Sequence, residues 1–225
     1  MRNLTSLFAL MVFCLSPENS YAQYCPSRIS AVTGNSLSEE VASLLRVVYE
    51  RLGCRPEIEF LPGRRAVHHF NASIVDGELF RLKMIEAEYK KPFVHSTELF
   101  RMTTALWMHP SPSIAQKNPT AYILGIVWQE EYVSGRLARD PGKYQKYHTH
   151  QQVLSAYNRG LIGHLLSEKQ SVEILRKRGE IKPVPVLEKT LGSLPVYHYL
   201  DEKYAEFIAD FSAEIARDNP FNKLN

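Results

Sequence analysis

The chain has 225 residues, 44% hydrophobic and 23% charged, so it is long enough for one large domain or two small lobes. It contains no low-complexity tract and no repeat of about 20–50 residues, which excludes disordered arrays and solenoids. The formal net charge is +3, and the one dense basic run, residues 176–178, ends a predicted helix, where cations suit the helix dipole. This pattern predicts no nucleic-acid partner.

Residues 1–22 have the features of a secretory signal peptide. A positive start at Arg2 precedes an apolar run at residues 4–15, and Ser20 and Ala22 are small residues suited to cleavage before Gln23. The apolar run is about 12 residues long, whereas a bilayer span needs about 20. We therefore expect a cleaved, soluble, periplasmic protein.

Cleavage leaves two cysteines, Cys25 and Cys54, in an oxidising compartment, where an even pair is more often bridged than free. Each precedes a predicted strand, at residues 28–33 and 57–61. If these strands are parallel neighbours, the two thiols begin side by side. We predict a structural disulfide, which closes a loop of about 30 residues and contributes roughly 3.5 kcal/mol in the chain-entropy model.

An amphipathic helix is predicted between those two strands. Ser36 and Glu39 form a capping-box pattern at its start, and Gly53 ends it. Its apolar positions recur at helical spacing: Val41, Leu44, Leu45, Val48, Tyr49 and Leu52. Such a strand-helix-strand unit of about 35 residues predicts a parallel sheet.

Residues 61–81 gather three arginines where two strand ends could converge. Arg64 and Arg65 lie on a short predicted helix, and a second strand-like run leads through Asp76-Gly77 to Arg81. This place suits an anion, because a guanidinium makes two parallel hydrogen bonds to a carboxylate. The alternative interpretation is a helix with solvated arginines and, for Arg81, a surface ion pair with Glu78, Glu86 or Glu88.

A second α/β series follows a proline-rich break. Residues 83–91 are charged and are helical or irregular, and residues 111–120 form a polar linker. The predicted strands are residues 92–95, 102–108, 122–128, 144–148, 161–166, 181–187 and 195–200. The predicted helices are residues 130–138, 151–158 and 168–177, and a last amphipathic helix that begins at Asp201. Two α/β series predict two lobes.

Three segments resemble the periplasmic solute-binding proteins of family 3, the polar amino-acid type that provides substrate-binding domains of ABC transporters. They are the LP-x-x-RA start at residue 61, the x-DG-x-x-x-R run that ends at Arg81, and residues 194–200 followed by a long helix. The resemblance implies the α/β, two-lobed periplasmic binding protein type II architecture, with mixed sheets and helices on both faces. It places lobe 1 at residues 23–104, lobe 2 at 105–191 and a return to lobe 1 at 192–225.

The resemblance also implies a ligand cleft outside the carboxyl ends of the strands. Arg81 looks like the family's arginine for an amino acid's α-carboxylate, and Glu168 is similar in placement to the acidic residue for its ammonium. The predicted ligand-binding residues are Arg64, Arg65, Arg81, Glu98, Trp128, Gln129 and Glu168. The chain departs from the family where a large ring, Trp128, replaces a glycine-rich turn. That ring either stacks on a solute or fills the cleft.

The eight histidines do not predict a metal centre. His68 and His69 are adjacent on a predicted helix and point to different faces, and no Cys, Asp or Glu lies within two residues of the pair His148 and His150. We expect structural or surface histidines, and no metal or other cofactor.

The sequence predicts non-covalent capture of a small polar, amino-acid-like solute with a carboxylate, by hinge closure and without enzymatic activity. The expected partners of this monomer are the solute and a membrane transporter or sensor. One alternative is a degenerate binding fold that acts as a protein-interaction module. Another is a dehydratase-like enzyme with Glu98, Glu130 and His95 as acid/base groups, although the common hydrolase and phosphate-binding motifs are missing.

Overall fold

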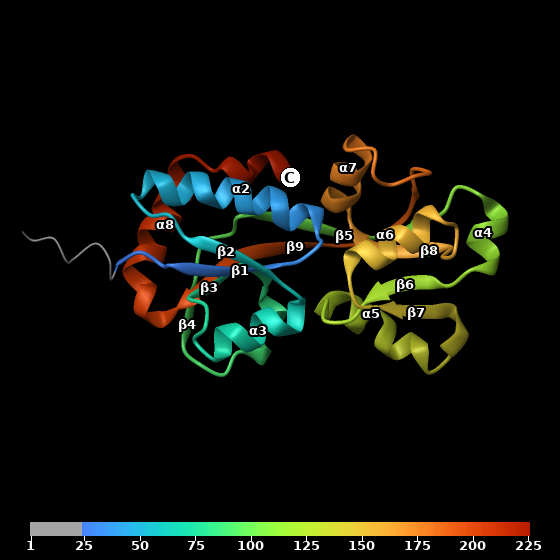
Figure 1. The fold of residues 1–225 in the computed structure, drawn as a ribbon, viewed down its shortest axis with the longest axis horizontal. Coiled ribbons are helices and arrows are strands. Elements are labelled where there is room, and N and C mark those ends of the chain that lie inside the picture. Colours follow the sequence, from blue (N-terminus) through green and yellow to red (C-terminus); the bar gives the residue numbers. More distant parts are fainter. Residues whose placement is uncertain (1–23) are drawn as a thin grey trace, which may run out of the picture.

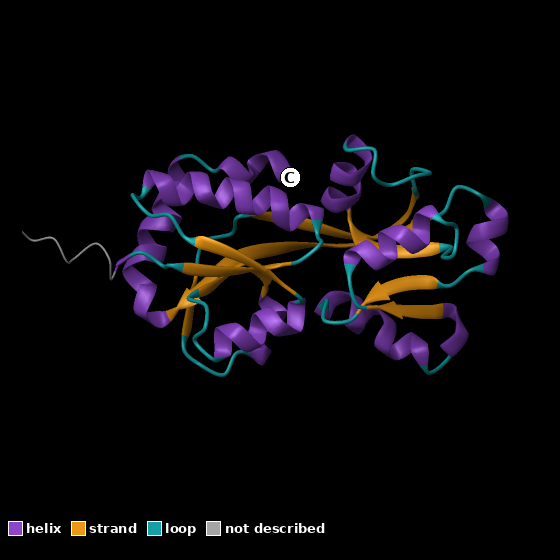
Figure 2. Ribbon diagram, in the orientation of Figure 1, coloured by secondary structure: helices purple, strands orange, loops and turns teal. Residues whose placement is uncertain are grey.

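The computed structural model describes residues 24–225, which form two α/β lobes set along the long axis of the molecule (Figure 1). In each lobe, helices lie on both sides of the strands (Figure 2). The two-lobed α/β architecture predicted from the sequence is confirmed. The predicted signal peptide, residues 1–22, lies outside the described residues.

The first lobe combines the beginning and the end of the described chain. Its short strands are β1 (Arg28–Val32), β2 (Glu57–Leu61), β3 (Gly77–Leu82) and β4 (Phe93–His95). Its α-helices are α2 (Ser36–Arg51), α3 (Gly63–Asn71) and α8 (Ala205–Arg217). Its 3-10 helices are η1 (Lys83–Glu88), η3 (Glu202–Tyr204) and η4 (Pro220–Leu224).

The second lobe is formed by the middle of the chain. Its strands are β6 (Thr120–Ile123), β7 (Tyr144–Tyr147) and β8 (His164–Glu168). Its helices are α4 (Pro112–Lys117), α5 (Val127–Leu137), η2 (Pro141–Lys143), α6 (His150–Asn158) and α7 (Lys169–Lys177). Strand β6 pairs in parallel with both β7 and β8.

Two long antiparallel strands, β5 (Phe100–Met108) and β9 (Val186–Asp201), run through both lobes (Figure 1). The strand order is β2-β1-β3-β9-β5-β8-β6-β7, and β4 pairs with β9. Strand β9 pairs with β3 and β4 in the first lobe, and β5 pairs with β8 in the second. These two strands therefore connect the lobes. The lobe limits at residues 104 and 191 stay a prediction.

The strand-helix-strand unit at the start of the described chain is confirmed. Strands β1 and β2 pair in parallel, from Arg28 opposite Glu57 onward. Cys25 and Cys54 form the predicted disulfide, with their Cα atoms 5.6 Å apart. The bridge ties the residues before β1 to the turn after α2, so the covalent link belongs to the first lobe alone.

The start of α2 differs from the predicted capping box. Asn35 is the N-cap, because its side-chain oxygen accepts hydrogen bonds from the backbone N–H groups of Leu37 at 2.9 Å and Ser38 at 3.4 Å. The hydroxyl of Ser36 donates instead to the carbonyl oxygen of Ser171 in the second lobe, at 3.2 Å. Asparagine and serine cap helices equally well, and the cap at Asn35 leaves Ser36 free for a contact between lobes.

The segment between residues 111 and 128 was predicted incorrectly. The expected linker at residues 111–120 contains α4, which starts at Pro112, a residue suited to the first helical turn. The expected strand at residues 122–128 is β6, which ends at Ile123. Gly125 then turns the backbone with a φ of 86°, which favours glycine. Trp128 consequently lies on α5, not on a strand.

The strands expected at residues 181–187 and 195–200 are one strand, β9, which begins at Val186. The predicted gap between the two strands is absent, because the whole of β5, from Phe100 to Met108, pairs with β9. Register shifts along this pair interrupt the alternation of side chains, which hid its continuity in the sequence.

Buried apolar side chains form a larger cluster centred on the first lobe and a smaller one in the second. In the larger cluster Tyr49 of α2 contacts Phe207 and Phe211 of α8, with ring centroids 4.7 and 5.9 Å apart. Across residues 24–225, none of the helices has the length and apolar character needed to cross a membrane.

Candidate ligand site between the lobes

A cavity of about 70 Å³ lies between the two lobes. Its apolar walls come from both lobes: Val32, Phe80, Leu82, Met84, Ile85, Met102, Ile126, Val127 and Val196. Its polar lining is Asn35, Ser38, Arg81, Trp128 and Glu168. The cavity is thus located at strand ends and helix starts, where α/β sheets place ligands. It brings together three of the predicted residues, Arg81, Trp128 and Glu168.

Arg81 forms a buried ion pair on the first-lobe wall. Its Nη2 donates to Oε1 of Glu78 at 2.6 Å, and the two side chains are 11% and 1% exposed. The hydroxyl of Tyr89 donates to the other Glu78 oxygen. Burial disfavours the charge of Arg81, but the Glu78 carboxylate outweighs burial and raises the pKa of Arg81. The pair is internally neutral.

Glu168 lies on the opposite wall, directly before α7, and is 2% exposed. Nε1 of Trp128 donates to its Oε1 at 3.1 Å, and the hydroxyl of Ser171 lies 3.0 Å from its Oε2. That hydroxyl also lies 3.2 Å from Oδ1 of Asn35, so its single proton serves one acceptor or the other. Within residues 24–225, no lysine or arginine forms an ion pair with Glu168.

His150, the first residue of α6, joins this network from the second lobe. Its Nε2 lies 3.1 Å from Nδ2 of Asn35, so the amide donates to a neutral imidazole. Burial lowers the pKa of His150, and the charge of Glu168 opposes that shift. Sequence analysis missed His150 and Ser171 as site residues. His150 lies three residues after the end of β7 and begins α6, and this position between a strand end and a helix start is the signal that could have identified it.

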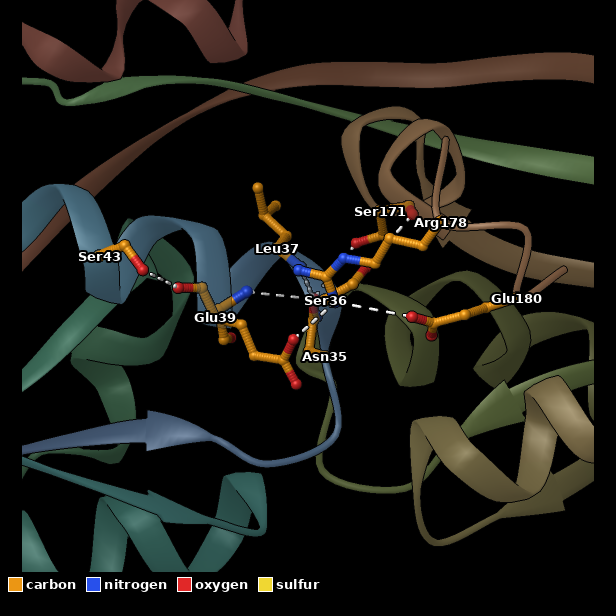
Figure 3. Close-up of polar contacts among 9 residues, drawn as sticks. Asn35, Ser36, Leu37, Glu39, Ser43, Ser171, Arg178 and Glu180 are labelled. Atoms are coloured by element: carbon orange, nitrogen blue, oxygen red, sulfur yellow. Dashed lines mark hydrogen bonds and ion pairs between the residues drawn. The ribbon is translucent and has the colours of Figure 1, made fainter. Parts of the chain in front are cut away.

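The lobes also touch through side chains outside the cavity. The first turn of α2 faces α7, and Arg178 donates to Glu39 at 2.7 Å (Figure 3). On α3, Nη2 of Arg64 pairs with Oε1 of Glu130 on α5 at 2.8 Å. The conformation is therefore closed around the cavity.

Backbone atoms of the two lobes approach closely next to the Arg64 bridge. A Cβ added to Gly63 would lie 2.7 Å from the carbonyl oxygen of Gly125, which is closer than atoms at this position tolerate. Only glycine at position 63 permits this closed contact without a shift of the backbone.

The remaining predicted residues do not line the cavity. Arg64 forms the bridge described above, and Arg65 is exposed. Glu98 pairs with Arg101 at 3.3 Å. Gln129 is 1% exposed and is bonded to the backbone of β6 and of β8, so it holds the second lobe together. Their ligand-binding role stays a prediction. Residues 24–225 contain no group of three or more His, Cys, Asp and Glu side chains arranged for a metal ion.

Two α/β lobes joined by two long strands, with a cavity lined from both sides, define the fold of the periplasmic binding proteins. No family model matches the sequence, and no curated protein matches it. Solved structures do match its fold. The predicted resemblance to the solute-binding proteins is confirmed at that level.

Three of these structures illustrate the match. A mutant of ArgBP from T. maritima has a TM-score of 0.70 and 10% identity, over 91% of this chain and 94% of that one. An ancestral amino acid-binding protein, a precursor of cyclohexadienyl dehydratase, has a TM-score of 0.68 and 10% identity, over 91% and 95%. A histidine kinase sensor domain has a TM-score of 0.65 and 11% identity, over 88% and 93%. At such identities the comparisons establish the fold.

Proposed function

We propose that the protein captures a small solute in the cavity between its lobes by hinge closure. The proposal rests on one observation: Arg81 on one lobe and Glu168 on the other line the same, mostly apolar cavity. Strands β5 and β9 connect the lobes and would act as the hinge. Ligand sites in proteins are typically concave and apolar with a few such placed polar groups.

The size of the cavity implies that capture begins with an opening of the lobes. Its volume of about 70 Å³ is well below the roughly 300–1,000 Å³ of typical small-molecule pockets. A ligand larger than a few atoms therefore enters an open form, and the closed contacts at Glu39 and Arg64 re-form around it or adjust to it.

The test is small-angle scattering together with tryptophan fluorescence, on protein with and without a mixture of small solutes. Capture predicts a more compact particle on addition of the mixture and a change in the emission of Trp128, whose ring lines the cavity. Native mass spectrometry of protein purified from its own host should show a co-purified small molecule. An unchanged particle with no bound mass contradicts the proposal.

A second candidate function, a protein-interaction module with a filled cleft, is favoured by one observation. The lobes are in direct contact, and Trp128 is 7% exposed and held by Glu168, so its ring takes up part of the space between the walls. This alternative predicts that no solute changes the scattering or the fluorescence, while a partner protein binds the outer surface.

The proposal includes export to the periplasm and delivery of the solute to a membrane transporter or a sensor, without catalysis. It is supported by the predicted signal peptide and by the fold, which also occurs in a sensor domain and in a precursor of a dehydratase. N-terminal sequencing of secreted material should find a mature start at Gln23. A precursor retained in the cytoplasm would contradict the export step.

A further inference from the structure

The charged groups at the cavity do not balance once the partner of Arg81, Glu78, is counted with them. Arg81 and Glu78 cancel each other at 2.6 Å. Glu168 adds a carboxylate whose partners are the neutral groups of Trp128 and Ser171. His150 beside it donates nothing from Nε2, which accepts from Asn35. The charged side chains of the lining are Arg81 and Glu168. Because Arg81 is already paired with Glu78, which does not line the cavity, the three groups together leave one carboxylate without a counter-charge among the described residues.

A ligand with a carboxylate and no cationic group would make this imbalance worse, and a zwitterion would leave it unchanged. To reach Arg81 the carboxylate would enter beside Glu78, and it would share a low-polarity cavity with Glu168. Like charges close together in a poorly solvated site repel strongly, because little water is present to screen them. Arg81, already neutralised by its own neighbour, offers a weaker attraction than a free guanidinium would.

A positively charged group would restore the balance. A carboxylate can accept about four hydrogen bonds, and Glu168 receives two at most from Trp128 and Ser171, so it can accept further donors. The rings of Phe80 and Trp128 line the same cavity, and aromatic faces attract cations. The other walls are aliphatic or thioether side chains, which suit an uncharged apolar body.

We infer that the ligand is an organic cation with an apolar body and no carboxylate, whose ammonium group binds Glu168. This inference rests on the proposed capture in the cavity and replaces the carboxylate-bearing solute expected from the sequence. Arg81 then acts by holding Glu78 and the first-lobe wall in place, and does not contact a charge of the ligand.

The experiment is a thermal-shift comparison of two matched series of probes. The first is 3-methylbutylamine, leucine and 4-methylpentanoate, and the second is phenethylamine, phenylalanine and 3-phenylpropanoate. Each series keeps one apolar body and changes the charge from cation to zwitterion to anion. At about 100 times its dissociation constant, a ligand raises the melting temperature by roughly 5–11 °C for a protein of this size. We expect that shift from at least one amine, a smaller one from its zwitterion and none from its anion.

Variants locate the effect. Glu168→Gln should abolish the shift produced by the amine, because the amide keeps the shape but not the charge. Glu173→Gln, on helix α7 that begins directly after Glu168, should keep it, because Glu173 is partly exposed and paired with Lys169. The wild-type charge series remains decisive even if Glu168→Gln does not fold.

The outcomes separate the inference from the proposed function. A larger shift from a zwitterion or an anion than from its amine overturns the inference and leaves solute capture standing. The same holds if a general solute mixture stabilises the protein while both amines do not. If neither the mixture nor any probe shifts the melting temperature, capture and the inference fall together.

Discussion

The two lobes are built from the same kinds of element but are held together differently. The first lobe has the disulfide, the returning helix α8 and the larger core, with Tyr49 and Phe211 fully buried. The second lobe has no cysteine and a smaller core. The difference indicates that the first lobe is the more stable of the two and the second lobe the more easily opened.

The strongest test of this comparison is removal of the disulfide. The double variant Cys25→Ser/Cys54→Ser should lose about 3.5 kcal/mol of unfolding free energy, because the bridge closes a loop with a sequence separation of 29 residues. That loss corresponds to a melting temperature lower by roughly 7–14 °C. Hydrogen exchange should rise mainly in the first lobe. Equal melting temperatures for variant and wild type, or a loss of protection centred on the second lobe, would contradict the comparison.

The second prediction concerns the pH dependence of the stability of the first lobe. Burial lowers the pKa of His198 to about 4, although hydrogen bonds to the carbonyl groups of Glu78 and Leu79 oppose the shift. As the pH falls below about 6.5, His198 therefore binds a proton in the unfolded chain, whereas in the folded chain it stays neutral down to about pH 4. This contribution is complete above pH 6.5 and is lost between pH 6.5 and about 4. By pH 5 the loss should be about 2 kcal/mol.

The measurement is denaturant unfolding at pH 7.5 and pH 5, for wild type, His198→Gln and the exposed control His148→Gln. His198→Gln should start less stable, because its partner Tyr49 Oη, 2.8 Å from Nε2, loses the imidazole. It should then lose about 2 kcal/mol less than wild type on acidification, whereas His148→Gln should follow wild type. Parallel pH profiles for all three proteins would refute the role of His198.

The third prediction concerns the contact between lobes. Gly63→Ala places a Cβ against the carbonyl oxygen of Gly125. A small opening of the lobes would remove this steric clash at the lowest cost in free energy. The expected cost to the closed state is about 1 kcal/mol, at the low end for overpacking, because the hinge can yield. Scattering should report a larger radius of gyration. The control Gly135→Ala on α5, where nothing lies within 4 Å, should keep the wild-type size.

The smallest effect is expected from the surface bridge between α3 and α5. Arg64 is 74% exposed, so its pair with Glu130 should contribute a few tenths of a kcal/mol and respond to salt. Arg64→Ala should leave the melting temperature within about 1 °C of wild type. A large destabilisation would mean that this ion pair contributes strongly to the stability of the fold, and would contradict the view that the lobes can separate at little cost.

The sequence determined those parts of the protein that depend on local pattern or covalent chemistry. Helical spacing from Val41 to Leu52 between two short strands predicted a parallel unit, and the positions of Cys25 and Cys54 before those strands predicted their bridge. Both follow from neighbours in the chain or from a loop that the unit itself closes. The order of elements was sufficient to indicate two lobes.

Only the tertiary structure decided which side chains meet across the molecule. Asn35 and His150 are 115 residues apart and lie in different lobes, and no local pattern relates them. Arg81 was predicted to hold an anion, with a surface pair to Glu78, Glu86 or Glu88 as the alternative. The structure pairs it with Glu78, three residues away in the chain, and buries the pair, which the sequence did not indicate. Whether a charge is available to a ligand depends on its nearest buried neighbour, and that neighbour is set by the packing of the fold.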